Sequence, residues 1–112
     1  MKSTSDLTSR RCKPCAPGTP PLSNYEADSL MKQLEGWQRY DHLIIRTYRF
    51  KNYYETIAFV NAVAWLSHSE DHHPDLAVSY NKCQVEYSTH SIHGLSENDF
   101  ICAAKVNALF KL

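Results

Sequence analysis

The stretch EDHHPDLAVSYNKCQVEYSTH, residues 70–90, alternates apolar and polar side chains on both sides of a short polar turn. This alternation predicts two strands, Leu76–Tyr80 and Cys83–His90, because successive side chains of a strand point to opposite faces of its sheet. Asn81-Lys82 is the predicted two-residue loop between them. The segment is therefore interpreted as an antiparallel hairpin with histidines at its open end.

A two-residue loop also fixes which residues of the two strands face each other. With Tyr80 opposite Cys83, the register places His73 opposite His90, about 5 Å apart at their Cβ atoms. A slip of one residue would turn His90 to the other face of the sheet. The register thus predicts that His90 lies beside the adjacent pair His72 and His73.

Pro74 sets the end of the preceding helix, because a residue before proline avoids the α region. The helix is expected to end at Asp71 or His72, where the partial negative charge of a helix C-terminus favours imidazolium. Neighbouring His73 and His90 disfavour simultaneous protonation of all three rings. Different pKa values on neighbouring groups produce an acid and a base near neutral pH, so the cluster is interpreted as proton-transfer machinery.

Capping signals and β-branched runs predict the remaining elements. The helices are expected over Ser23 to about Glu35, Asn52 to about Asp71 and Ser96 to about Phe110, and the further strands over Trp37–Tyr40 and Leu43–Phe50. The order α-β-β-α-β-β-α predicts an α+β fold, a four-stranded antiparallel sheet with three helices packed on one face. Ala64 and Ala108 are expected on the buried helix faces.

Residues 1–22 are predicted to be a flexible Pro/Ser-rich basic tail, and residues 23–112 the folded domain. The tail holds four of the five prolines and has too little apolar surface to offset its ordering entropy. A transit peptide is the alternative for such a basic segment. Cys12 and Cys15 form a C-x-x-C motif within it, which leaves a redox pair and half of a zinc site as open alternatives.

The whole chain has 12 basic and 12 acidic residues, and this zero net charge argues against direct nucleic-acid binding. No apolar run approaches the roughly 18 residues of a membrane span, so no membrane association is expected. No secretory signal is visible in the sequence. Its four cysteines are therefore expected to be reduced thiols, and the protein is expected in the cytoplasm.

Other functions of the histidines remain open. The convergence of His72, His73 and His90 could be a coincidence rather than a sign of catalysis. Metal binding is a second alternative, because His68 lies four residues before His72, a spacing found in zinc sites. No matched carboxylate or cysteine motif follows, so no metal is expected. His42 and His93 are interpreted as solvated turn residues, whereas either Asp71 or Asp75 is a candidate to orient an imidazole.

The motifs D-H-H-P-D at 71–75, Y-N-K at 80–82, S-T-H at 88–90 and G-L-S-E-N-D at 94–99 closely resemble those of pterin-4a-carbinolamine dehydratases. The resemblance covers about residues 22–110 and includes Gly36-Trp37, Phe50-Lys51 and Phe59. It implies a homodimer or homotetramer that dehydrates 4a-hydroxytetrahydropterin to quinonoid dihydropterin. This reaction recycles the pterin of an aromatic amino acid hydroxylase, with phenylalanine hydroxylase as the expected enzyme, and needs no metal or organic cofactor.

The family's three functional histidines fall on His72, His73 and His90, the residues that the register brings together. The expected substrate-binding residues are His68, Asp71, Pro74, Ser88 and Thr89. Many members carry glutamate where this chain has His68, so that position departs from the family pattern. His72 is the expected general acid, with the other two histidines as base and hydrogen-bond donors. Two alternatives are a protein-binding module, since animal relatives are dimerisation cofactors of a homeodomain transcription factor, and a small metal-binding protein.

Overall fold

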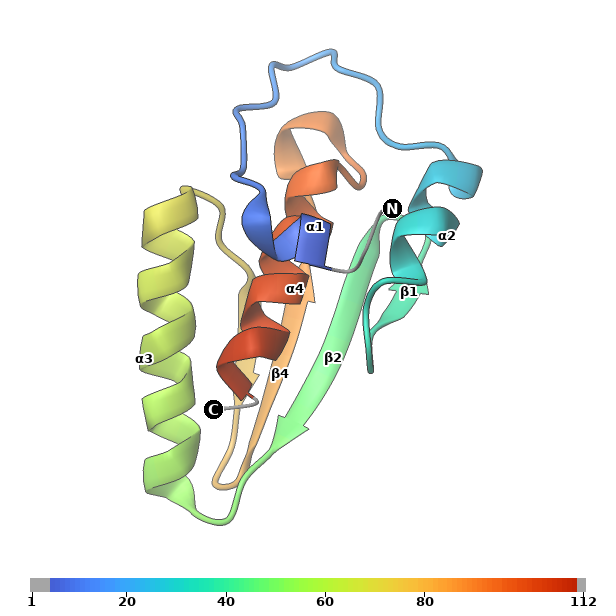
Figure 1. The fold of residues 1–112 in the computed structure, drawn as a ribbon. Coiled ribbons are helices and arrows are strands. Elements are labelled where there is room, and N and C mark those ends of the chain that lie inside the picture. Colours follow the sequence, from blue (N-terminus) through green and yellow to red (C-terminus); the bar gives the residue numbers. More distant parts are fainter. Residues whose placement is uncertain (1–4, 111–112) are drawn as a thin grey trace.

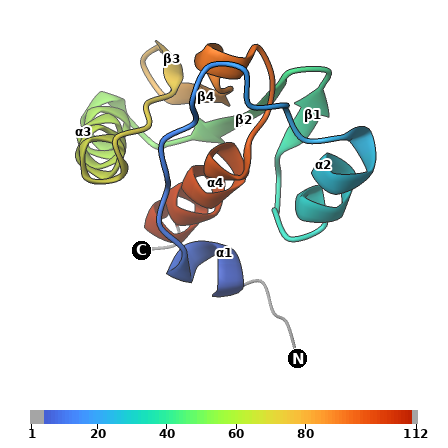
Figure 2. The ribbon, with the colours of Figure 1, turned by 90° about the horizontal axis from the view of Figure 1, so that it is seen from above.

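The computed structural model describes residues 5–110, which form a four-stranded antiparallel sheet of order β1-β2-β4-β3 (Figure 1). Its strands are β1 (Gln38–Tyr40), β2 (Leu43–Arg49), β3 (Asp75–Val78) and β4 (Lys82–Tyr87). The helices α2 (Asn24–Met31), α3 (Tyr53–Glu70) and α4 (Glu97–Phe110) lie on one face of this sheet (Figure 2). The predicted α+β fold and order of elements are confirmed, with one helix added at the N-terminus.

Side-chain caps fix where the helices begin. Ser23 and Glu26 form a reciprocal capping box at the start of α2. Asn52 Oδ1 accepts a hydrogen bond from the Glu55 amide at 2.9 Å and caps α3. These caps satisfy amide donors that the first helical turn leaves unpaired. The predicted starts are therefore confirmed, although α2 ends at Met31 rather than near Glu35.

The core lies between the sheet and the helices. Its largest fully buried side chains include Tyr48, Tyr87, Phe100, Ile44 and Ile101. The predictions for Ala64 and Ala108 are wrong, because both lie on exposed sides of their helices. Near the C-terminal end of α4, donors from Trp37, Arg46 and Tyr48 share one acceptor, Oδ1 of Asn107.

The predicted register of the β3-β4 hairpin is wrong by two residues. Val78, not Tyr80, pairs with Cys83, and the Ser79 amide donates to the Lys82 carbonyl at 2.9 Å. The turn therefore contains Tyr80 and Asn81. Thr56 Oγ1 donates to the Tyr80 carbonyl at 2.9 Å, which holds the turn against the first turn of α3. Because the shift is even, each side chain keeps its predicted face of the sheet.

The strand β4 ends at Tyr87, so the predicted strand reaching His90 is too long. His90 instead begins the 3-10 helix η1 (His90–Ile92), which Thr89 and Gly94 enclose through an isolated β-bridge. His93 completes this reversal in a left-handed conformation. His90 is thus positioned by a turn rather than by a strand pair.

The N-terminal segment departs from the flexible tail that the sequence predicts. Helix α1 (Ser5–Ser9) packs against α4, with Leu7 fully buried, and the chain then crosses the end of the helical layer (Figures 1 and 2). Glu70 and Asn98 bind the backbone amides of Cys12 and Lys13. The composition of this segment suggests that nothing offsets the entropy lost when it becomes ordered. The buried leucine and the bound amides offset part of that cost.

Candidate active site

His72 is held at the end of α3 by a buried carboxylate from another helix. The C-cap residue Asp71 takes a left-handed conformation, with φ of 53°, and turns the chain out of the helix. His72 Nε2 then lies 2.7 Å from Asp99 Oδ1 of α4. The His72 side chain is 12% exposed and that of Asp99 is fully buried. This is a charge-assisted hydrogen bond in a largely desolvated position.

Asp99 is itself fixed by three donors. Its Oδ2 atom accepts hydrogen bonds from Thr89 Oγ1 at 2.9 Å and from the Ser96 amide at 3.0 Å, while Oδ1 faces His72. The Ser96 hydroxyl continues the network, at 2.8 Å from Thr89 Oγ1. The cap of α4 therefore also orients the catalytic candidate His72.

The surroundings of His72 favour its protonated form. Burial lowers the pKa of His72, but the hydrogen bond and negative charge of Asp99 outweigh burial and raise the pKa above its ordinary value of 6.5. The imidazole also stacks on the Tyr87 ring, with centroids 5.7 Å apart and planes 7° apart. An aromatic face next to an imidazolium adds to this preference.

His73 and His90 form a second, more exposed group. Their ring centroids are 6.5 Å apart in an edge-on arrangement. The predicted meeting of these two residues is therefore present, although a turn rather than the strand register produces it. His72 is bound instead to Asp99 and stacked on Tyr87.

Two hollows adjoin these histidines and share Thr89 as a wall. One, of about 210 Å³, is lined by Asp71, His72 and residues 12–15 of the N-terminal segment. The other, of about 550 Å³, is lined by Ser88, His90 and two further histidines, His42 and His93. Histidine side chains thus line the hollows on both sides of Thr89.

The other predicted residues lie at different distances from this centre. Asp71 and Ser88 each line one of the hollows, and Pro74 is half-buried between His73 and β3. His68 is exposed and packs its ring against Trp65, with centroids 5.3 Å apart. Within residues 5–110, no three His, Cys, Asp or Glu side chains are grouped closely enough to hold a metal ion.

Comparison with known proteins identifies the family. The family model described as pterin 4 alpha carbinolamine dehydratase matches residues 20–109. This chain belongs to the pterin-4a-carbinolamine dehydratase family. A relative from Nitrosomonas europaea, named as a member of the same family, is 65% identical over 99% of both chains, and one from Nitrosospira multiformis is 62% identical over 96% of this chain and 95% of its own.

Solved structures agree with the fold. A transcriptional coactivator/pterin dehydratase from Brucella melitensis has a TM-score of 0.76 and 32% identity, covering 80% of this chain and 97% of its own. A pterin dehydratase-like protein, described as a RuBisCO assembly factor in the alpha-carboxysome, has a TM-score of 0.56 and 24% identity over 66% of this chain and 86% of its own. The second likeness supports the fold alone.

Sequence reasoning missed two features of this dehydratase-family site. Asp99, interpreted from sequence only as part of a helix cap, holds His72, whereas Asp71 and Asp75 are exposed. His42 and His93 are exposed as expected, yet they line the hollow beside His90. A carboxylate three residues after a capping serine was the only sequence signal for Asp99, and it does not specify a histidine partner.

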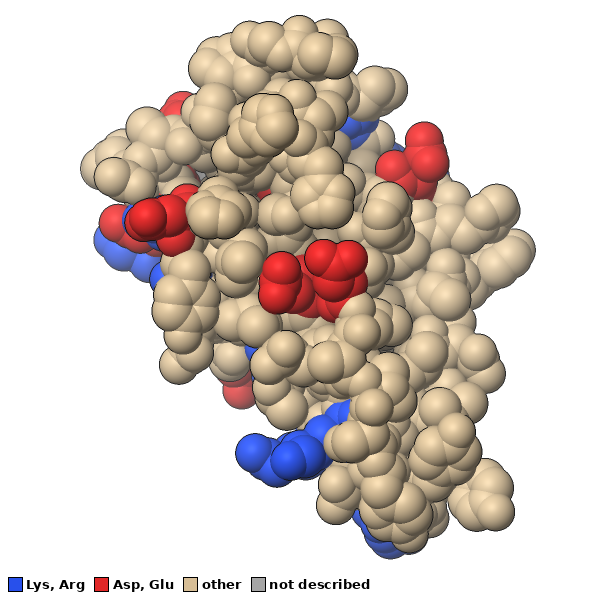
Figure 3. All heavy atoms as spheres, turned by 180° about the vertical axis from the view of Figure 1, so that it is seen from behind, with Lys and Arg blue, Asp and Glu red and all other residues tan. Residues whose placement is uncertain are grey.

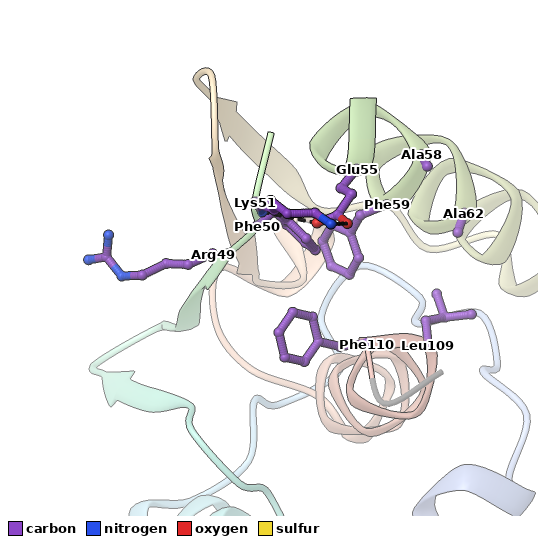
Figure 4. Close-up of a pocket in the computed structure, with 9 residues that line it drawn as sticks. All are labelled: Arg49, Phe50, Lys51, Glu55, Ala58, Phe59, Ala62, Leu109 and Phe110. Carbon is purple, nitrogen blue, oxygen red and sulfur yellow. Dashed lines mark hydrogen bonds and ion pairs between the residues drawn. The ribbon is translucent and has the colours of Figure 1, made fainter. Parts of the chain in front are cut away.

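A larger cavity, of about 660 Å³, lies away from the histidines (Figure 4). Phe50, Phe59 and Phe110 point toward one another in it, and a 3.9 Å ion pair between Lys51 and Glu55 lies at its rim. Its walls are mainly apolar and contain no histidine. It therefore offers surface for contact rather than groups for proton transfer.

On the face shown in Figure 3, the basic and acidic side chains of the described residues lie in separate small groups. They do not form a continuous basic surface of the kind that binds an anionic polymer there. None of the helices that the structure describes is long and apolar enough to cross a membrane.

Proposed function

We propose that this protein dehydrates 4a-hydroxytetrahydropterin to quinonoid dihydropterin and water by histidine acid-base catalysis. Membership of the pterin-4a-carbinolamine dehydratase family supports the substrate class. The observation that carries the mechanism is the 2.7 Å contact between His72 Nε2 and Asp99 Oδ1, which raises the pKa of His72 and favours its imidazolium form. Protonation is what the reaction requires first, since hydroxide is a poor leaving group.

In this proposal His72 delivers a proton to the 4a-hydroxyl, which departs as water. A proton leaves a ring nitrogen as the C=N bond forms, and His73 or His90 accepts it while the other donates a hydrogen bond to the pterin. Positioned general acids and bases each contribute roughly 10²–10⁴-fold to such a step. The position of Asp99 against His72, and not against the exposed His73-His90 pair, supports this division.

The binding residues follow from the two hollows. Asp71, Ser88 and Thr89 line the space beside His72 and His90, and Pro74 fixes the chain after the two adjacent histidines. His68 replaces the glutamate found in many relatives, and we propose that it contacts the substrate less directly, because its ring packs on Trp65. No metal or organic cofactor enters this scheme, since imidazoles supply and remove both protons.

We further propose that the protein is cytoplasmic, recycles the pterin of an aromatic amino acid hydroxylase and forms a homodimer or homotetramer. The oligomer is supported by strand β3, which within residues 5–110 pairs with β4 alone, and by exposed aromatic side chains on α3. Tyr54 is 81% and Trp65 71% exposed. Light scattering of the purified chain tests the oligomer: a monomer at micromolar concentration contradicts it.

The alternative is a protein-binding module, which is favoured by one observation. The Brucella melitensis relative carries the name of a transcriptional coactivator as well as of a pterin dehydratase. Capture of a partner that is lost on changing exposed α3 residues, such as Trp65→Ala, but kept in His72→Ala would support this alternative.

The deciding experiment is an absorbance assay with freshly made 4a-hydroxytetrahydropterin. The wild-type chain is compared with His72→Ala and with the double variant His73→Ala/His90→Ala, and thermal melting confirms that each is folded. We expect both variants to lose at least about 10²-fold in turnover. Folded variants that retain wild-type turnover would rule out the histidine mechanism, and a wild-type chain without activity would rule out the enzyme.

A further inference from the structure

Two thiols from distant parts of the chain meet beside His72. Cys12 Sγ, in the segment after α1, lies 3.5 Å from Cys102 Sγ in the middle of α4. Cys102 is fully buried, whereas Cys12 is half-buried and lines the hollow that contains His72. One sulfur is therefore accessible to a small reagent, and the other is in contact with it.

The backbone around Cys12 is held in place on both sides. The Cys12 amide donates to Glu70 Oε1 at 2.9 Å, and the Lys13 amide donates to Asn98 Oδ1 at 3.0 Å. Asn98 Nδ2 returns a hydrogen bond to the Lys13 carbonyl at 2.6 Å. These contacts keep the thiol of Cys12 directed at α4. The sulfurs need to approach by about 1.5 Å to reach the disulfide bond length of about 2 Å.

The same geometry separates Cys12 from its C-x-x-C neighbour. Cys15 Sγ is directed to Asn98 Nδ2 at 3.6 Å and to the Lys13 carbonyl at 3.9 Å. Cys83 is fully buried on β4. The fold therefore selects Cys102, and not the sequence neighbour Cys15, as the partner of Cys12.

We propose that Cys12 and Cys102 are a site of reversible oxidation that forms an intramolecular disulfide when the protein meets a peroxide. The Cys12 thiol attacks hydrogen peroxide, which gives a sulfenic acid and one water. The Cys102 thiol then attacks the sulfenic sulfur, forms the S–S bond and releases a second water. Two thiols are oxidised and one peroxide is reduced, and an external dithiol reverses the change.

The disulfide fixes one wall of the His72 hollow to α4. Cys102 Sγ also lies 3.9 Å from the His72 carbonyl oxygen, so the bond forms next to the residue that follows α3. Cys102, His72 and Glu70 of α3 act on the Cys12 thiol, and the neighbouring Arg11 donates a hydrogen bond to Glu70. The hydrogen bond with Cys102 and burial raise the pKa of Cys12, so the first step is slow at neutral pH and accelerates as pH rises.

The experiment uses the full chain with Cys15→Ser and Cys83→Ala, which leaves Cys12 and Cys102 as its two thiols. The variant is treated with equimolar hydrogen peroxide, blocked with iodoacetamide and digested with trypsin without reductant. We expect a linked pair of peptides, residues 12–32 and 83–105, from protein that runs as a single chain on a non-reducing denaturing gel, and the loss of this pair after dithiothreitol. In a separate limited proteolysis of the folded protein, the rate of tryptic cleavage after Arg11 should fall by about tenfold on oxidation, because a segment held by a disulfide opens less often.

The wild-type chain is treated in parallel, with Cys102→Ala as the matched control that cannot form the bond. Three results would overturn the proposal: a Cys12–Cys15 bond within peptide 12–32, a disulfide between two chains, or singly oxidised thiols that never condense. None of these readouts depends on turnover, so the outcome is separate from that of the proposed dehydratase activity.

Discussion

Replacing Asp99 by asparagine tests the proposed role of the buried carboxylate most directly. Two donors, Thr89 Oγ1 and the Ser96 amide, converge on Oδ2, whereas His72 faces Oδ1. An asparagine that keeps the first two hydrogen bonds must place its carbonyl oxygen at the Oδ2 position. Its NH₂ group then faces His72 Nε2, which accepts a hydrogen bond only when it carries no proton.

The magnitude follows from the bond that is lost. A hydrogen bond to a charged group contributes about 1.5–3 kcal/mol, and Asp99→Asn removes this contribution from the imidazolium form of His72 alone. The pKa of His72 falls as a result. If that imidazolium delivers the proton in the rate-limiting step, the same energy corresponds to a fall in turnover of between about 10-fold and about 160-fold.

The effect on stability has a definite pH dependence. The pKa of His72 is raised in the folded protein, so its pairing with Asp99 stabilises the fold fully below the ordinary pKa of 6.5. This contribution is lost as pH rises through the raised, folded value. Asp99→Asn should therefore destabilise the protein more at pH 5.5 than at pH 9, as measured by urea unfolding.

The assays are an NMR titration of the His72 ring and turnover of 4a-hydroxytetrahydropterin. Glu97→Gln is the matched control, because it makes the same carboxylate-to-amide change on α4 at an exposed side chain paired with Arg10. We expect the control to keep the His72 titration and turnover of the wild type. An unchanged His72 pKa in folded Asp99→Asn protein would refute the assignment of Asp99 as the residue that favours the imidazolium.

Three further predictions concern stability. Burial raises the pKa of Glu70, but hydrogen bonds from the Cys12 amide and Lys105 lower it to about 2 from an ordinary 4.5, so its stabilisation is complete above pH 4.5 and disappears as pH falls toward 2. Lys105→Met should therefore destabilise the protein in urea at pH 7 and much less at pH 2. Asn107→Leu leaves three side-chain donors without their shared acceptor and should cost about 2–4 kcal/mol, read from urea midpoints with an unchanged slope. Gly36→Ala adds a Cβ 2.5 Å from the β2 guanidinium at a φ of +85°, and should lower the melting temperature more than Gly18→Ala, where φ is +93° and the space is open.

The sequence predicted the location of the elements better than their exact pairing. Capping residues such as Ser23 and Asn52 act within a few residues, so the helix starts follow from local chemistry. The hairpin register depends on Thr56, which binds the Tyr80 carbonyl from another element. That tertiary contact moves the turn by one residue and the register by two. The alternation of apolar and polar residues along the strands does not predict it. The predicted faces are nevertheless right, because an even shift preserves the alternation.

The candidate site was predictable in part for the same reason. The position of His72 and His73 follows from a helix stop, which is a local signal, whereas His90 lies beside His73 because of a turn that the predicted hairpin register does not contain. The partner of His72 is contributed by α4, and its identity depends on how α3 and α4 pack. Likewise, the burial of Leu7 and the contact between Cys12 and Cys102 depend on α1 lying against α4. A composition rich in proline and serine reports the entropy of ordering but not the contacts that offset it.

The proposed mechanism depends on the separation of the three histidines into two environments, one for the acid and one for the base. Three imidazoles in mutual contact would compete for protons, and their titrations would be coupled. Here His72 is desolvated and bound to a carboxylate, whereas His73 and His90 are exposed and contact each other. In the first environment Asp99 raises the pKa of His72, so in the proposed mechanism the acid is distinguished from the other two histidines by position rather than by residue type. A turn that placed all three rings together, as the predicted strand register would, lacks this distinction.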